Sequence, residues 1–279
     1  MTGRYAPSPT GPLHLGNLRT ALLAWLFARA AGSRFHLRIE DLDAGRVRRE
    51  HERGQLDDLA ALGLDWDGTP VRQSERGELY ADAVARLDVY PCYCTRAEIR
   101  EAASAPHGER PEGAYPGTCR ALTAAERAGR ERAGRPPALR VRAAGGIDDF
   151  VVRRNDGAFA YNLAVVVDDA AQGIEQVVRG ADLEDTTPRQ RWLAQTLGLP
   201  VPDHRHVPLV LGRDGSRLAK RHGAVTLADR RETPAAVRGL LAGSLGRANP
   251  GSPPTLDELL ARFDPAALPP EPWTLPGRR

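Results

Sequence analysis

The chain has 279 residues, of which 41% are hydrophobic and 27% charged, and its formal net charge of +3 does not by itself indicate a nucleic-acid-binding protein. This is enough for one large globular domain or two small ones, and no stretch approaches the ~20 consecutive apolar residues of a membrane helix. We expect a cytoplasmic protein without membrane association, because the first motif begins close to residue 1 and leaves no room for a signal peptide.

The N-terminal residues predict a strand, a turn and a helix. Thr2–Ala6 is short and partly apolar, residues 7–12 contain three prolines, and Leu18–Ala30 carries apolar residues at helical spacing. A helix beginning near His14 points its free N–H groups and positive dipole end at whatever lies over the turn, which suits a polyphosphate. Gly16 leaves room for a nucleotide, and His14 can donate a hydrogen bond to a phosphate oxygen. The alternative is that His14 only caps the helix.

Alternating strand and helix patterns continue to about residue 90. Ser33–Ile39 predicts a strand, Arg48–Leu62 a helix, and residues 63–67 a turn into an extended segment. This βαβ order predicts a parallel sheet in an α/β fold of the Rossmann type.

The pattern breaks over residues 90–137, which hold glycines, prolines, an Ala-, Arg- and Glu-rich helix, and all three cysteines, Cys92, Cys94 and Cys119. In a protein expected to be cytosolic, this grouping favours a metal over a disulfide. Three thiolates are one ligand short of a tetrahedral zinc site, and the spacing leaves His107 and Tyr115 as candidates for the fourth. The alternative is three free buried cysteines.

Two hairpins are predicted in the second half of the chain. The first joins Phe150–Arg154 to Ala158–Val167 through the turn Asn155-Asp156-Gly157. The second covers Leu209–Leu218 and leads into a basic loop. Two short amphipathic helices follow residue 228, and residues 250–276 form a Pro-rich tail.

Lys220, in the glycine-flanked loop Gly212–Gly223, is the one lysine among 39 basic residues. A compact, flexible ammonium can do what the planar guanidinium cannot, and contact with phosphate during chemistry is one such task. Chance placement in a lysine-poor chain is the alternative, but the position within this loop favours a function.

The two motifs together resemble the paired signatures of class I aminoacyl-tRNA synthetases. Residues 14–17, His-Leu-Gly-Asn, resemble the HIGH element, and Arg217–Arg221 resembles the KMSKS element, with Ala219 where a serine often precedes the lysine. Further blocks resemble the glutamyl-tRNA synthetase branch and follow the family order up to about residue 230, namely residues 4–11, 37–43, 178–183 and 187–190.

The resemblance implies that ATP, accompanied by Mg²⁺, converts glutamate to glutamyl-adenylate, with His14 and Lys220 as catalytic residues. The implied ATP site consists of His14, Gly16, Asn17, Leu218 and Lys220. The implied glutamate site consists of Arg4, Tyr5, Ala6, Pro7, Ser8, Glu40, Tyr161 and Arg179. In it, Arg4 and Arg179 are cations for the substrate, Glu40 is the partner of its ammonium group, and Ser8 and Tyr161 form hydrogen bonds.

Without the resemblance, these residues have ordinary structural interpretations. Arg4 would pair with Glu40 or Asp41, Tyr161 would belong to a hairpin core, and Arg179 would lie at the surface. Chemistry alone favours His107 as the fourth zinc ligand, but the resemblance implies Tyr115. We therefore predict one structural Zn²⁺ per chain, bound by Cys92, Cys94, Tyr115 and Cys119.

The predicted domains are a Rossmann catalytic domain in two halves, 1–90 and 146–228, an inserted zinc-containing acceptor-type subdomain, 91–145, and a short helical and Pro-rich C-terminal segment, 229–279. We expect this length to leave no room for a helical anticodon-binding region. The resemblance therefore implies a shortened relative that transfers glutamate to the queuosine base in the anticodon of tRNA(Asp). We expect a monomer whose partners are ATP, L-glutamate and tRNA(Asp) carrying queuosine. The open alternatives are a minimal glutamyl-tRNA synthetase that charges a tRNA 3′ end and a non-catalytic zinc-containing RNA-binding module.

Overall fold

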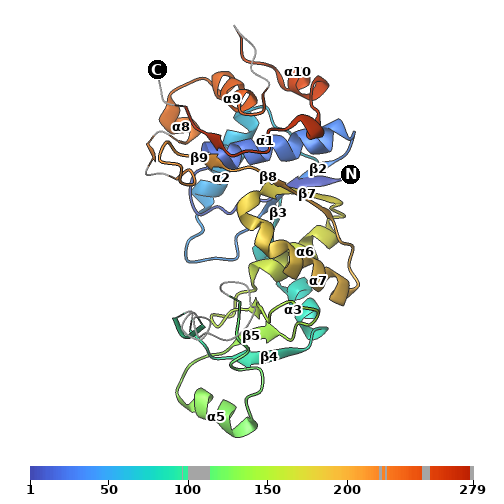
Figure 1. The fold of residues 1–279 in the computed structure, drawn as a ribbon, viewed down its shortest axis with the longest axis vertical. Coiled ribbons are helices and arrows are strands. Elements are labelled where there is room, and N and C mark those ends of the chain that lie inside the picture. Colours follow the sequence, from blue (N-terminus) through green and yellow to red (C-terminus); the bar gives the residue numbers. More distant parts are fainter. Residues whose placement is uncertain (96, 100–113, 220–221, 224, 247–251, 277–279) are drawn as a thin grey trace. The chain divides into compact units, whose positions relative to one another are not determined.

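The computed structural model describes residues 1–95, 97–99, 114–219, 222–223, 225–246 and 252–276. The chain forms two compact units (Figure 1). The first contains Met1–Ser74, Gln172–Asp185 and Pro202–Arg279, and the second contains Glu75–Ala171 and Thr186–Val201. Among the described residues, each helix is too short or too polar to cross a membrane. The predicted domain limits at residues 90, 145 and 228 stay predictions.

A five-stranded sheet in the order β3-β2-β1-β7-β8 lies at the centre of the first unit, and its neighbouring strands are all parallel. The order reverses at β1, which pairs with β2 on one side and β7 on the other, and this arrangement is the switch point of Rossmann folds. The predicted α/β fold with a parallel Rossmann-type sheet is confirmed. The strands are β1 (Gly3–Tyr5), β2 (Phe35–Ile39), β3 (Val71–Arg72), β7 (Gln176–Gly180) and β8 (Asp203–Val207).

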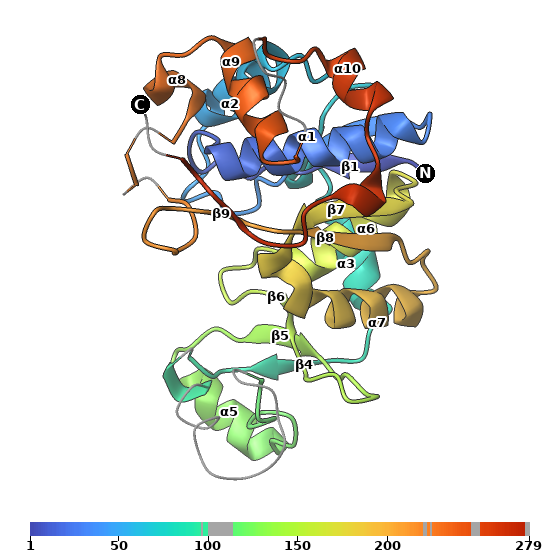
Figure 2. The same ribbon diagram turned by 45° about the horizontal axis from the view of Figure 1, so that its top comes forward.

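Helix α1 (Leu15–Ala30) follows β1 and packs on the sheet through contacts with β1, β2 and β7. The run Ala21–Leu26 is apolar at every position and fully buried, because the C-terminal helices cover the side of α1 that faces away from the sheet (Figure 2). The predicted helix start near His14 is confirmed. Helix α2 (Arg49–Ala61) lies between β2 and β3 in the chain, within the range Arg48–Leu62 predicted for it.

The C-terminal segment completes the first unit. It forms α8 (Leu227–Arg230), α9 (Pro234–Gly243), α10 (Leu256–Ala261), the short 3₁₀ helix η4 (Pro265–Ala267) and β10 (Trp273–Thr274). The two predicted amphipathic helices correspond to α9 and α10. Strand β10 pairs with β9 (Val210–Leu211), where the Trp273 N–H donates to Leu209 O at 3.0 Å. The Pro-rich tail is thereby fixed to the strand that leads into the lysine loop.

The second unit combines a three-stranded antiparallel sheet with a group of helices. The sheet has the order β4-β5-β6 and consists of β4 (Val89–Cys92), β5 (Ala138–Val141) and β6 (Val151–Arg153). The short 3₁₀ helices η1 (Gln73–Glu75) and η2 (Ala181–Thr186) lie near the points where the chain passes between the units. The α-helices are α3 (Gly77–Ala85), α5 (Ala124–Arg132), α6 (Tyr161–Ala171) and α7 (Thr187–Leu197).

The hairpin predicted after β6 is only partly correct. The turn forms, because the Arg154 N–H donates to Ala158 O at 2.8 Å and the Ala160 N–H donates to Val152 O at 3.0 Å. The prediction of a strand up to Val167 is wrong, because α6 begins at Tyr161. Its valines favour strands intrinsically, but residues 163–169 are all buried, and packing of α6 against α3 and α7 outweighs that preference.

Candidate functional site

The first-unit residues predicted to bind glutamate gather at the carboxyl ends of the parallel strands. Tyr5 ends β1, Glu40 follows β2, and Arg179 is the second-last residue of β7. Ligands of open α/β sheets bind at this edge, beside the strands where the order reverses. The sequence blocks that are far apart in the chain therefore converge because the strands are parallel.

His14 caps the N-terminus of α1. Its Nδ1 accepts the Asn17 N–H at 3.2 Å, and Asn17 Oδ1 accepts the His14 N–H at 3.2 Å. Since Nδ1 is an acceptor in this network, we assign the proton of the neutral ring to Nε2. Burial, followed by the positive charge of Arg217, lowers the pKa of His14. The capping interpretation and the phosphate-donor interpretation are thus compatible, because they use different ring nitrogens.

The start of α1 is suited to an anion. Its first turn contains no acidic side chain, so the positive end of the helix dipole is not neutralised there. The Leu15 N–H donates to Val225 O and the Asn17 N–H to His14, whereas the Gly16 N–H has no acceptor among the described residues. A Cβ on Gly16 would lie 3.0 Å from both Cε1 and Nδ1 of His14. The glycine therefore makes space for the imidazole ring, which the sequence did not indicate.

The base of the lysine loop lies in the same unit. Leu218 is 2% exposed within the hydrophobic core and donates its N–H to Val210 O at 3.0 Å. An antiparallel bridge between Leu211 and Arg217 confirms the predicted hairpin in this part. The side chain of Leu218 packs in the hydrophobic core, so any contact of this residue with ATP has to come from its backbone. Lys220 lies outside the described residues.

A histidine that sequence reasoning missed organises this loop. The His222 ring accepts the Ala219 N–H on Nδ1 at 2.9 Å, and its Nε2 lies 3.1 Å from Asp214 Oδ1. Ser216 donates its backbone N–H to the same Asp214 oxygen at 3.0 Å. This bond, the Ser216 hydroxyl and His222 together lower the pKa of Asp214 to about 2. A Cβ on Gly212 would lie 2.5 Å from the His222 ring, so this glycine gives the ring its place.

An ion pair connects the loop after β7 with the base of the lysine loop. Arg217 Nη1 lies 2.6 Å from Asp182 Oδ2. Asp182 crowds Gly180, where a Cβ would lie 2.5 Å from its Oδ1. Both charges act on His14, Arg217 lowering and Asp182 raising its pKa. The described part of the second motif is therefore close enough to the first to influence its histidine.

The predicted cations of the glutamate site are buried, with Arg4 5% and Arg179 4% exposed. Arg179 donates from Nε to His206 Nε2 at 3.3 Å and from Nη2 to Leu183 O at 3.2 Å. The surface position considered for Arg179 is thus wrong. Arg38, which is fully buried and was missed in the sequence, contacts Glu40 at 3.5 Å.

The backbone of the first loop is held from two directions. The Glu40 N–H donates to Pro7 O at 2.9 Å. Gln55 of α2 donates its side-chain amide to Ser8 O at 3.0 Å and to Gly11 O at 2.7 Å. The loop from Ala6 to Gly11 is therefore fixed by a glutamine that has no local sequence signal. Burial and the Glu40 charge raise the pKa of Tyr5, so its phenol keeps its proton.

Tyr161 belongs to the second unit, where it begins α6 and is 36% exposed. The position considered for it in a hairpin core is wrong, because α6 is a helix and the side chain is exposed. Its predicted contact with glutamate stays a prediction.

The three cysteines and Tyr115 form a cluster in the second unit. The three Sγ atoms lie within 4.8 Å of one another, and those of Cys94 and Cys119 are 3.5 Å apart. Tyr115 Oη lies 3.4 Å from Cys92 Sγ and 3.8 Å from Cys94 Sγ. Bond lengths of ~2.3 Å for Zn–S and ~2.0 Å for Zn–O at tetrahedral angles place ligand atoms about 3.5–3.8 Å apart. The separation of Cys94 from Cys119, and those of Tyr115 from Cys92 and Cys94, therefore match the spacing of ligands around a tetrahedral zinc ion. His107, the other candidate, lies outside the described residues.

Burial opposes the ionisation of three groups in this cluster, Cys92, Cys94 and Tyr115. Burial, together with Cys119 and the charge of Cys92, raises the pKa of Cys94 to about 12. Burial likewise raises the pKa of the Tyr115 phenol. Burial opposes ionisation of Cys92 too, but hydrogen bonds from Tyr115 and Arg140 contribute to a pKa below the ordinary value. A bound dication would supply the positive charge that allows the sulfurs to ionise together.

The chain matches the family model of class I tRNA synthetases (E and Q), catalytic domain, over residues 1–145 and 143–234. It is 60% identical to the glutamyl-Q tRNA(Asp) synthetase of Nocardia farcinica over 98% of this chain and 92% of that protein. It is 51% identical to the protein of the same name from Symbiobacterium thermophilum over 99% and 96%.

Among solved structures, a glutamate tRNA ligase from Elizabethkingia meningosepticum, in complex with its amino acid, superposes with a TM-score of 0.81 at 25% identity. The match covers 99% of this chain and 67% of that protein. The chain therefore belongs to the class I glutamyl and glutaminyl tRNA synthetase family and, within it, to the glutamyl-Q tRNA(Asp) synthetases.

Proposed function

We propose that this enzyme activates L-glutamate with ATP in the absence of tRNA and then transfers the glutamyl group to the queuosine base in the anticodon of tRNA(Asp). The observation that carries the proposal is the position of a neutral histidine donor, His14, in the unit whose strand ends also hold Arg4, Glu40 and Arg179. The names of the relatives support the same reaction.

In the first step, a carboxylate oxygen of glutamate attacks the α-phosphorus of ATP, the bond to the β-phosphate breaks, and pyrophosphate leaves. The enzyme's task is positioning and stabilisation of the charge that develops on the phosphate oxygens. His14 Nε2–H, the Gly16 N–H and the start of α1 are donors for this purpose, and Lys220 contributes its ammonium group. Mg²⁺ bound with ATP would screen the triphosphate.

Recognition of glutamate follows from the buried charges. Arg4 and Arg179 provide guanidinium groups for carboxylate, and Glu40 provides a carboxylate for the ammonium group. Tyr5 and the backbone of residues 6–8 lie at the start of the same loop, and the Ser8 hydroxyl is a further hydrogen-bonding group. In the second step, a hydroxyl of the queuosine diol attacks the activated carbonyl carbon, and AMP leaves.

We also propose that Cys92, Cys94, Tyr115 and Cys119 hold one structural zinc ion. The spacing of their atoms supports this, and the buried side chains of Tyr90 and Tyr93 form one apolar cluster with three of the proposed ligands, Cys92, Tyr115 and Cys119. Metal analysis of the purified chain tests it, with one zinc per chain expected and less than a tenth of that refuting it.

The reaction is tested in two stages. Pyrophosphate exchange with glutamate and no RNA should be measurable, and its absence from a folded preparation would contradict tRNA-independent activation. Mass spectrometry of the nucleosides after incubation with tRNA(Asp), glutamate and ATP should find glutamate on queuosine. A tRNA with intact queuosine and a 3′-deoxy terminal nucleotide, which lacks the 3′ diol, should give the same product. A product lost with the 3′ diol would instead identify a minimal glutamyl-tRNA synthetase, the reaction for which the Elizabethkingia protein is named.

A further inference from the structure

A buried arginine connects two of the four side chains of the metal cluster. Arg140 is 8% exposed and donates from Nε to Cys92 Sγ at 3.2 Å. Its guanidinium carbon lies 3.7 Å from the centre of the Tyr115 ring. One planar group thus contacts a sulfur ligand through its edge and the phenol ligand through its face.

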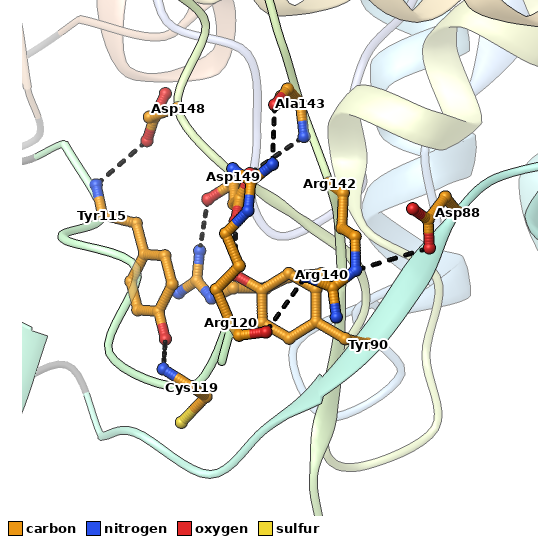
Figure 3. A network of polar contacts seen from close by, with 10 residues as sticks. All are labelled: Asp88, Tyr90, Tyr115, Cys119, Arg120, Arg140, Arg142, Ala143, Asp148 and Asp149. Atoms are coloured by element: carbon orange, nitrogen blue, oxygen red, sulfur yellow. Dashed lines mark hydrogen bonds and ion pairs between the residues drawn. The ribbon is translucent and has the colours of Figure 1, made fainter. Parts of the chain in front are cut away.

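The position of Arg140 is itself fixed by the loop between β5 and β6. Its Nη1 donates to the carbonyl oxygen of Asp149 at 2.8 Å. The Asp149 carboxylate accepts from the Tyr90 hydroxyl at 2.6 Å, from Arg120 at 2.8 Å and from the Ala143 N–H at 2.9 Å. Figure 3 shows these donors converging on Asp149. A residue with three such bonds on its carboxylate is a rigid support for the guanidinium.

The same loop positions Tyr115. The Tyr115 N–H donates to Asp148 Oδ2 at 3.0 Å, and Arg189 of α7 pairs with the other oxygen of Asp148 at 2.8 Å. The Tyr115 Oη also accepts the Cys119 N–H at 2.8 Å. The backbone of Tyr115 and the group stacked on its ring are therefore both tied to residues 148 and 149.

The positive charge of Arg140 also bears on the charge of the ligand set. Three thiolates and one phenolate around a dication leave a net negative charge in a buried site, and such charge is costly unless a cation lies beside it. Arginine suits this place because its delocalised, planar charge can stack on an aromatic ring while its edge donates hydrogen bonds. A lysine ammonium cannot make both contacts from one position.

We propose that Arg140 is a positioning residue of the metal site, which holds the phenol of Tyr115 as the fourth ligand and offsets the negative charge of the ligand set. The proposal rests on the zinc ion proposed above. It assigns to Arg140 the role that hydrogen-bonding partners outside the ligand shell have in other metal sites.

Arg142 is the matched control. It lies two residues further along the chain, and its guanidinium stacks on the Tyr90 ring at 4.6 Å and pairs with Asp88 at 3.5 Å. Arg142 thus also stacks on a buried tyrosine beside the same sheet, but that tyrosine is not among the proposed ligands. A general loss of sheet stability should affect Arg140→Gln and Arg142→Gln alike, whereas a loss of ligand positioning should affect only the first.

The test uses the full chain and its Arg140→Gln, Arg140→Lys, Arg142→Gln and Tyr115→Phe variants. Zinc affinity is measured by competition with a chromophoric chelator. Coordination is measured from the visible absorption of the cobalt(II)-loaded chain and from the near-ultraviolet difference band of a metal-bound phenolate. Far-ultraviolet circular dichroism confirms that each variant is folded.

We expect Arg140→Gln to weaken zinc binding by about 10- to 100-fold and to give the cobalt spectrum of Tyr115→Phe, without the phenolate band. Arg140→Lys should keep part of the zinc affinity but should also lose the phenolate band. If Arg140→Gln does not fold, Arg140→Lys provides the test in its place. Arg142→Gln should match the wild type. Wild-type affinity and spectrum in both Arg140 variants would overturn the proposal while leaving the zinc site intact. Equal losses in Arg142→Gln and Arg140→Gln would also overturn it. A wild-type chain that binds no zinc would refute the zinc proposal itself.

Discussion

Gly16→Ala should separate the stability of the enzyme from its activity. The added methyl carbon would lie 3.0 Å from Cε1 and Nδ1 of His14, whereas ordinary carbon contacts begin near ~3.5 Å. The imidazole must therefore move by about half an ångström, which moves the Nε2–H that we propose as a phosphate donor. Loss of one preorganised donor costs about 10²- to 10³-fold in kcat. Because this change displaces the donor without removing it, we expect about a 10- to 100-fold lower rate of pyrophosphate exchange.

The stability of the same variant should change little. Alanine in place of glycine favours a helix by about 0.5–1 kcal/mol, and the tight contact with the ring costs a similar amount, about 1 kcal/mol. The assay is pyrophosphate exchange without RNA, together with the midpoint of thermal unfolding. Gly54→Ala is the control, because Gly54 lies inside α2 with nothing within 4 Å of an added Cβ. It should stabilise the chain and leave exchange unchanged. Wild-type exchange in Gly16→Ala would show that the position of the His14 ring does not matter for activation.

Four other substitutions probe charges and contacts in the first unit. Burial and then Asp57 raise the pKa of Asp58 to about 6. The folded chain therefore holds this proton more tightly than the unfolded chain does. The resulting stabilisation of the fold is complete below the ordinary pKa of 3.8 and is lost as the pH rises to about 6. The pKa shift is worth about 3 kcal/mol, which solvent screening reduces. Asp58→Asn should therefore raise the free energy of unfolding in urea by about 1–2 kcal/mol at pH 8. An equal gain at pH 4 would contradict this cause. His222→Gln removes the ring that accepts the Ala219 N–H at 2.9 Å. The kcat for pyrophosphate exchange should therefore fall about 10-fold, while the KM for glutamate stays unchanged. A raised KM would argue against a role confined to the lysine loop. Asp182→Asn should lower the pKa of His14, and Arg217→Gln should raise it. Both pKa values can be measured by NMR from the proton resonances of the imidazole ring. Shifts of the same sign would show that the two charges do not act directly on His14.

Features with a short-range cause were predictable from the sequence. The start of α1 at His14 was recognised because glycine and proline precede an apolar helical pattern, and the parallel sheet followed from strands that alternate with helices. The cysteines and Tyr115 were grouped from spacing and resemblance, and the structure brings their side chains together.

The missed features depend on contacts between distant segments. Gln55 fixes the loop at Ser8 from 47 residues away, and Arg140 contacts Cys92 from 48 residues away. Neither residue type has a local pattern that predicts its partner. The valine run in α6 was misassigned to a strand because intrinsic preference was the only local signal, whereas burial on all sides decides the structure there.

The arginine-rich composition has a physical reason in the interior of both units. Six arginines are buried among the described residues, namely Arg4, Arg19, Arg38, Arg140, Arg179 and Arg230. Arg19 shows why this is possible, because it donates to Ser244 Oγ at 2.8 Å and to Pro208 O at 2.6 Å from one rigid group. An ammonium group is a more strongly hydrated point charge, so burial without water is more costly for it. Arginine therefore serves the buried positions, and the single lysine stands in the loop where the sequence predicts phosphate chemistry.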